Sequence, residues 1–229
     1  MTQPQQRLRI TFAKGEFLRW ISHLDLVRLW ERVLRRAGIP VAYTRGYNPQ
    51  MRIQFAAALP TGSFGRAELF DVWLEKPMSP ETFAALIRPQ LPSGVELLDV
   101  REVDLREPSL QSQVRAAEWR VAVEATEVPE AELRRRVDEV LAAKELIRTR
   151  RRRQREAARA YDLRPLIESL RFERKDEEGW VALHMRLRAE PGATGRPDEV
   201  LHALGLSGRP SKMERLALYL ASPAETSDR

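Results

Sequence analysis

Arginine side chains recur at one-turn intervals between residues 22 and 37. Arg28, Arg32 and Arg35 fall at i, i+4 and i+7, so a helix here would place them on one face. Apolar residues occupy the opposite face, namely Leu26, Trp30, Val33 and Ala37. With Arg36 nearby and Glu31 as the opposing charge, a bound anion would relieve the repulsion on this face. A phosphate backbone is such an anion, although a solvated helix surface would have the same pattern.

A turn-forming segment follows this helix. It consists of Arg45, Gly46, Tyr47, Asn48 and Pro49. Glycine accepts a positive φ angle, and the Asn-Pro pair favours a turn. Tyr47 could stack on a nucleotide base beside Asn48, or it could instead cover the edge of a sheet. If the strand and helix order given below is right, we expect the turn to lie beside the helical arginines.

The densest block of charge spans residues 148–159, where seven arginines accompany one glutamate. The arginines expected to contact phosphate are Arg150, Arg151, Arg152, Arg153 and Arg155. This block cannot enter a core, and a flexible basic loop of this kind binds phosphates without reading sequence. The alternative is an insertion that only keeps the chain in solution.

His23 lies between Ser22 and Asp25, an arrangement that resembles a catalytic triad in its residue types. Ser22 and Asp25 also have the spacing of a helix cap, in which their side chains turn toward backbone N–H groups. His23 is then left as the candidate acid or base for RNA cleavage. The two other histidines stand alone and the sequence has no cysteine, so we expect no metal site and no cofactor.

The strands and helices that would position these residues follow from periodicity and from breaker residues. In the first half we expect strands at 7–14, 51–59, 67–75 and 95–103 and helices at 22–37 and from 79 to about 91. Alternation of Leu8, Ile10 and Phe12 with polar residues gives the first strand one buried face. Apart from a short strand near 40–44, the order is β-α-β-β-α-β, which is the ferredoxin-like arrangement.

The same order recurs in the second half. We expect strands at 119–125, 165–174, 180–189 and 214–221 and helices at 129–146 and 197–204. The polar stretch 104–113, which contains Pro108, is predicted to be a linker. The sequence therefore predicts an α+β protein of two tandem ferredoxin-like halves with antiparallel sheets, occupying residues 1–104 and 114–222.

Charge is distributed unevenly along the chain. Residues 1–66 contain eleven Arg or Lys and three Asp or Glu, whereas residues 67–109 contain four and nine. The positive field thus belongs to the first segment, and the acidic segment could neutralise it within the fold. The sequence has no apolar run of the length that a membrane span requires, and its start lacks a secretory signal, so we expect a cytoplasmic protein.

The stretch from Phe17 to Gly62, which contains SHLDL, RRAG and GYNP, resembles the radical-SAM-linked protein family, a domain of unknown function. The stretches AELFDVWLEKP, YDLRPLIESL and RPDEVLHALGL extend the resemblance over nearly the whole chain. It implies a domain fused to or encoded beside a cobalamin-binding radical SAM protein, often near genes for ribonuclease E/G. That family typically has a histidine and a proline after the GxNP turn, where this chain has Gln50 and Met51.

Together these features predict an RNA-binding accessory or adaptor protein that works with a radical SAM protein or a ribonuclease. Because a radical SAM cluster needs three thiolates and the chain has no cysteine, the chain would be a partner of that enzyme. One alternative is an RNA-processing or RNA-modifying enzyme of the tandem ferredoxin-like type. Another is a protein-interaction scaffold without nucleic acid, in which the acidic and basic segments dock a partner.

Overall fold

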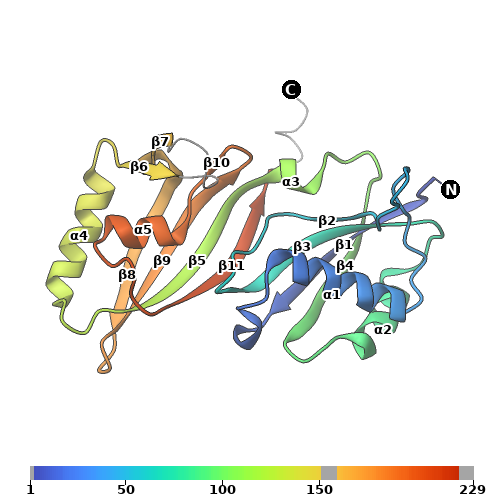
Figure 1. The fold of residues 1–229 in the computed structure, drawn as a ribbon, viewed down its shortest axis with the longest axis horizontal. Coiled ribbons are helices and arrows are strands. Elements are labelled where there is room, and N and C mark those ends of the chain that lie inside the picture. Colours follow the sequence, from blue (N-terminus) through green and yellow to red (C-terminus); the bar gives the residue numbers. More distant parts are fainter. Residues whose placement is uncertain (1–2, 151–158, 222–229) are drawn as a thin grey trace. The chain divides into compact units, whose positions relative to one another are not determined.

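The computed structural model describes residues 3–150 and 159–221. Two units can be distinguished, residues 1–114 with 215–229 and residues 115–214. Both combine helices with mainly antiparallel strands, which makes the fold α+β (Figure 1). The limits 1–104 and 114–222 stay a prediction. None of the helices formed by the described residues has both the length and the apolar character that a membrane-spanning helix requires.

The sheet of the first unit has the order β4-β1-β3, and β2 also pairs with β3. Its strands are β1 (Gln6–Lys14), β2 (Ile53–Phe55), β3 (Ser63–Leu74) and β4 (Val95–Val103), and these pairings are antiparallel. Helices α1 (His23–Arg36) and α2 (Pro80–Ile87) cover one face of the sheet (Figure 1). The shorter helices are η1 (Glu16–Leu18), η2 (Arg88–Gln90) and α3 (Leu110–Gln113).

The core of this unit forms between the sheet and the two helices. Leu8, Ile10 and Phe12 of β1 are fully buried there, as the alternation in the sequence predicts. Phe12 packs edge-on against Trp30 of α1, with ring centroids 5.1 Å apart, and Phe70 of β3 lies 4.7 Å from Trp30. This aromatic cluster fixes α1 against the sheet, and therefore fixes which side of α1 remains outside.

The opposite face of the same sheet is also buried around Arg7 and Arg9, which the sequence did not predict, whereas Asp99 and Arg101 of β4 on that face are exposed. Arg7 and Arg9 alternate with the core residues, yet they are only 1% and 2% exposed. The segment 104–113, expected to be a linker, lies against them. Arg7 donates hydrogen bonds to the carbonyl oxygens of Glu107 and Pro108, at 2.8 and 3.0 Å. Strand periodicity identifies one apolar face but cannot show what covers the other.

In the second unit, β9 (Trp180–Glu190) pairs with both β5 (Val114–Glu124) and β8 (Ile167–Lys175), while β10 (Ala193–Thr194) turns back onto its end. The helices are α4 (Glu130–Ala142), η3 (Arg164–Leu166) and α5 (Pro197–Ala203). Strand β11 (Ser211–Leu220) crosses the division between the units at residue 215.

Two predicted features of these units differ from the structure. The arginine-rich insertion begins and ends in a two-stranded antiparallel sheet, β6 (Ile147–Arg150) with β7 (Arg159–Asp162), whereas the sequence predicted a loop. The strand expected near 40–44 is reduced to isolated bridges at Val41 and Tyr43. The other predicted strands and helices are present with shifted ends.

Candidate nucleic-acid interface

Helix α1 begins where the sequence predicts. Ser22 is its N-cap, and the Ser22 hydroxyl accepts a hydrogen bond from the Asp25 backbone N–H at 3.2 Å. The same hydroxyl donates to the Asp25 carboxylate at 2.7 Å, which lowers the pKa of Asp25 below its usual value. Gly38 ends the helix with a φ of +66°, a conformation that suits glycine. Because Ser22 and Asp25 bond to each other as a cap, they do not form a triad with His23.

The helix presents its arginines to solvent. Arg28, Arg32 and Arg35 are exposed, while the buried residues of α1 are Leu26, Trp30, Val33 and Leu34. Arg28 forms an ion pair with Asp25 at 3.5 Å, and Arg36 donates to the carbonyl oxygen of Gln90 at 2.7 Å. Arg32 and Arg35 form no ion pair with any residue that the structure describes. Two charges one turn apart are therefore without a counterion.

The arginines of helix α4, in contrast, form ion pairs with glutamates of the same helix. Arg134 pairs with Glu130 at 2.7 Å, and Arg135 pairs with Glu132 at 2.7 Å. Arg136 pairs with Glu132 as well, at 2.8 Å. A solvated helix that contains several arginines can thus neutralise them within itself, as α4 does. On α1 this holds for Arg28, which pairs with Asp25, but Arg32 and Arg35 have no such ion pair among the described residues.

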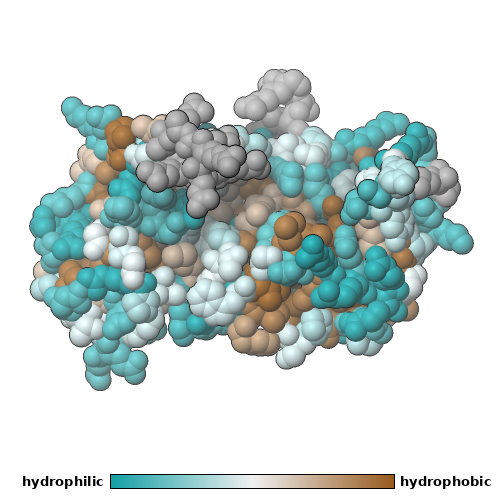
Figure 2. Space-filling view, viewed as in Figure 1, coloured by the Kyte–Doolittle hydropathy of each residue, from teal (hydrophilic) through white to brown (hydrophobic). Residues whose placement is uncertain are grey.

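Three large apolar side chains lie exposed at the start of α1. Phe17 is 65% exposed, Trp20 69% and Leu24 66%. Figure 2 shows hydrophobic surface over η1 and the first turn of α1, next to the hydrophilic surface of the rest of α1. The guanidinium of Arg19 lies over the Trp20 ring, 5.2 Å from its centroid. Sequence reasoning missed this apolar patch, because its spacing is also that of a buried helix face.

The turn at residues 45–49 is exposed throughout. Tyr47 is 99% exposed, and Arg45 and Asn48 are exposed beside it. Gly46 has a φ of +135°, which a residue with a side chain rarely adopts. No hydrogen bond or ion pair joins this turn to the arginines of α1 within the described residues. The Tyr47 ring is therefore not covered by any of the described residues.

Little of the arginine-rich insertion belongs to the described part of the chain. Arg150 ends β6, and the predicted phosphate contacts Arg151, Arg152, Arg153 and Arg155 lie outside the described residues. Arg148, which belongs to the described residues, pairs with Glu199 at 3.1 Å and is mostly buried. Arg148 therefore has a structural partner within the second unit.

His23 is the first residue of α1 and packs inward. Its ring meets Phe55 edge-on, with centroids 5.3 Å apart. Its Nδ1 atom is buried and has no hydrogen-bond partner among the described residues. Burial lowers the pKa of His23 below its usual value, and the charges of Arg215 and Lys14 lower it further against the opposing effect of Glu68. The imidazole is therefore neutral at physiological pH.

A buried charged cluster near His23 accounts for part of this shift. Glu68 and Arg215 form an ion pair in which the Arg215 Nε donates to Glu68 at 2.8 Å. Lys14 donates to the carbonyl oxygens of Ser63 and Ile21, at 3.0 and 3.3 Å. Burial lowers the Lys14 pKa to about 8. Sequence reasoning missed this cluster, because its members are far apart along the chain. Among the described residues, no three His, Asp or Glu side chains are placed to hold a metal ion.

The chain matches a protein family and resembles chains of known structure. A family model described as "Uncharacterized protein conserved in bacteria (DUF2344)" matches residues 7–197. No curated protein matches the chain. Among solved structures, a chain in the crystal structure of a Cbf5-Nop10-Gar1 complex is 13% identical with a TM-score of 0.54, over 92% of this chain and 48% of that chain. A chain of the archaeal box H/ACA sRNP Nop10-Cbf5 complex is 14% identical with a TM-score of 0.49, over 93% and 48%. This chain thus spans about half the length of those chains.

Proposed function

The chain belongs to the DUF2344 family of bacterial proteins, and we propose that it binds RNA as an accessory or adaptor protein through the exposed face of α1. The observation that carries this proposal is the pair Arg32 and Arg35, which are exposed one turn apart without a counterion among the described residues. RNA phosphates would supply the missing charge. Arginine also holds phosphate oxygens through two parallel hydrogen bonds.

The apolar patch of Phe17, Trp20 and Leu24 supports RNA over a simple anion. Single-stranded nucleic acid is commonly held by a basic surface next to aromatic rings on which bases stack. Here the rings of Phe17 and Trp20 lie at one end of α1, and the arginines continue along it. Stacking tolerates any base, so the interface would bind RNA with little preference for sequence.

The remaining predicted contacts extend the same proposal. Arg36 and Arg45 would add phosphate contacts, and Tyr47 with Asn48 would contact a nucleotide. The arginine-rich insertion would contribute a second basic element from the other unit. In each half, the strands and helices that recur in β-α-β-β-α-β order support a ferredoxin-like arrangement, which would make the protein a tandem of two such modules.

Binding to fluorescently labelled RNA tests the proposal. We expect Arg32→Ala/Arg35→Ala to weaken the affinity for a single-stranded oligonucleotide by at least about tenfold, since each lost contact involves a charged group. The matched control is Arg134→Ala/Arg135→Ala, which removes two charges from a helix whose arginines are already paired. Fluorescence anisotropy measures both. Equal losses in the two variants would show that net charge alone governs binding and would contradict the assignment to α1.

Stacking on the apolar patch gives a second expectation. Trp20→Ala should weaken RNA binding by about 1–3 kcal/mol, the usual cost of losing one base–aromatic stack. The free energy of unfolding should change by less than about 0.5 kcal/mol, because Trp20 is 69% exposed. Leu105→Ala is the control, since Leu105 is an exposed apolar residue away from α1. RNA affinity unchanged by Trp20→Ala would remove stacking from the proposal, and Tyr47→Ala tests the turn in the same way.

The alternative functions make different predictions. An RNA-processing enzyme that used His23 would cleave labelled RNA without added metal, whereas an adaptor should leave the RNA intact. Both the scaffold and an adaptor that works with a radical SAM protein or a ribonuclease require a protein partner. A pull-down that survives nuclease treatment identifies such a partner. If that complex forms while RNA binding is absent, the scaffold replaces the RNA-binding proposal.

A further inference from the structure

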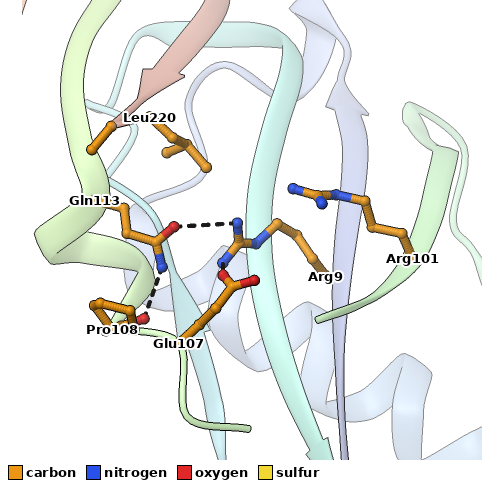
Figure 3. A pocket seen from close by; sticks show the side chains of 7 residues that line it. Arg9, Arg101, Glu107, Pro108, Gln113 and Leu220 are labelled. Carbon is orange, nitrogen blue, oxygen red and sulfur yellow. Dashed lines mark hydrogen bonds and ion pairs between the residues drawn. The ribbon is translucent and has the colours of Figure 1, made fainter. Parts of the chain in front are cut away.

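A cavity of about 290 Å³ lies in the first unit, at the sheet face opposite α1. Its polar wall contains Arg9 of β1, Arg101 of β4, Gln113 and the carboxylate of Glu107, and its apolar wall contains Pro108, Leu220 and Ala221. Figure 3 shows Arg101 extending toward the guanidinium of Arg9, with Gln113 and Leu220 around the same space. Because Arg9 alternates with the core residues of β1, this cavity is independent of the α1 interface.

Two arginines face each other directly in this cavity. Arg9 and Arg101 are opposite partners in the register of β1 with β4. Like charges at directly opposite positions destabilise an antiparallel pair. Arg101 is exposed and forms no ion pair or hydrogen bond with the described residues, and this includes Asp99, the next carboxylate on the same side of β4. No carboxylate of the described residues therefore balances its positive charge.

The carboxylates around Arg9 do not supply this balance. Asp71 is fully buried and is shared between Arg7 and Arg9, with which it forms ion pairs at 2.5 and 2.8 Å. Glu107 pairs with Arg9 at 3.3 Å. Three arginines thus meet two carboxylates, which leaves one positive charge in excess. A single anionic group would neutralise it.

The hydrogen bonds of Arg9 also indicate room for an anion. Arg9 is 2% exposed, and its Nε and Nη2 atoms bond to Asp71 at 2.8 and 3.1 Å. Its Nη1 atom, by contrast, reaches only the Gln113 Oε1 atom at 3.5 Å. Buried guanidinium groups normally have well-made bonds at each nitrogen. The weakly satisfied edge of Arg9 and the unpaired Arg101 are donors for one oxyanion.

We propose that this cavity binds a small organic anion, whose carboxylate or phosphate group is held between Arg9 and Arg101. The volume suits a molecule of a few heavy atoms, because it lies just below the usual range for ligand pockets. Leu220 and Ala221 give this molecule a short apolar contact. Arg9 is a fixed donor, since Asp71 holds it in place, and Arg101 is the residue that closes on the ligand.

Calorimetric titration of the full chain tests this site, with isobutyrate as the carboxylate probe and inorganic phosphate as the other. Ionic strength is held constant with sodium chloride. We expect saturable binding of at least one probe, and Arg101→Gln should weaken it at least about tenfold. Arg88→Gln is the control, because Arg88 is exposed in the same unit and its loss changes the net charge equally. Isobutyrate binding alone identifies a carboxylate, and phosphate binding alone identifies a phosphate.

Thermal unfolding without either probe gives an independent readout. Arg101→Gln should raise the unfolding temperature, since it removes one of two like charges. Gln113→Glu should abolish the binding of the probes, because its carboxylate would occupy the position of the anion beside Arg9. The proposal is overturned if neither probe binds the wild-type chain below about 10 mM, or if Arg101→Gln binds them as the wild type does.

Discussion

Asp71 is the carboxylate on which the buried polar face of the first unit depends. It is fully buried and is bonded to both Arg7 and Arg9. Removing one partner of a buried ion pair leaves an uncompensated charge, which is costlier than losing the pair as a whole. We expect Asp71→Asn to lower the free energy of unfolding by about 3–5 kcal/mol.

Urea unfolding followed by circular dichroism measures this change. Asp138→Asn is the control, because Asp138 is exposed on α4 and a surface change there should stay within about 0.5 kcal/mol. A loss for Asp71→Asn as small as that of the control would show that the buried arginines have other counterions.

Lys14 gives the stability a dependence on pH. Its pKa falls from the usual 10.5 to about 8 in the folded chain, because burial disfavours the ammonium. Between these two pH values the unfolded chain binds the proton and the folded chain does not. The free energy of unfolding should therefore rise with pH across this window, by up to about 3 kcal/mol.

The comparison with Lys14→Met isolates this effect from other groups that titrate above pH 8. Urea unfolding at pH 7.5, 8.5 and 9.5 should show the wild type gaining stability relative to Lys14→Met. If the two chains respond to pH in parallel, Lys14 is ionised with an ordinary pKa and the burial argument is wrong.

At the scale of elements, α1 depends on a local signal at its first turn. The Ser22 cap satisfies the Asp25 N–H, and Ser22→Ala should cost about 1 kcal/mol of stability. Ser93→Ala is the matched control, since Ser93 is exposed and lies outside any helix. Chemical denaturation compares them. Equal stability of the two variants would mean that core packing alone fixes the start of α1.

Elements with strong local signals could be predicted from the sequence, and those that depend on distant contacts could not. Ser22 and Gly38 bound α1 closely, and Ser79 with Pro80 marks the start of α2. The β6 and β7 strands were missed, because arginine-rich segments lack the alternation that identifies a strand. Segment 104–113 was predicted to be a linker because its residues are polar. Its contact with Arg7 could not be predicted, because Arg7 lies about 100 positions away in the sequence.

At the scale of the whole chain, the acidic segment 67–109 neutralises only part of the positive charge of residues 1–66. The acidic segment 67–109 supplies Asp71 and Glu107 to the arginines of β1 and Glu68 to Arg215. It supplies no ion-pair partner to Arg32 or Arg35 within the described residues. The positive field of the N-terminal segment therefore emerges on α1 rather than on β1.

The candidate interface could be predicted only in part from the sequence. Helical spacing identifies Arg28, Arg32 and Arg35, because their exposure follows from the apolar stripe opposite them. The absence of counterions for two of them, and the exposure of Trp20, depend on tertiary packing that the spacing does not encode. The facing of Arg9 and Arg101 depends on a strand register set by residues 92 positions apart.

Salt dependence of RNA binding tests the central claim most directly. The slope of log Kd against log salt counts the phosphate contacts of a protein, at about 0.7–0.9 for each. We expect Arg32→Ala/Arg35→Ala to lower this slope by about 1.4–1.8, and Arg134→Ala/Arg135→Ala to leave it at the wild-type value. A slope unchanged by the α1 variant, or lowered equally by both variants, would contradict the assignment of the RNA interface to α1.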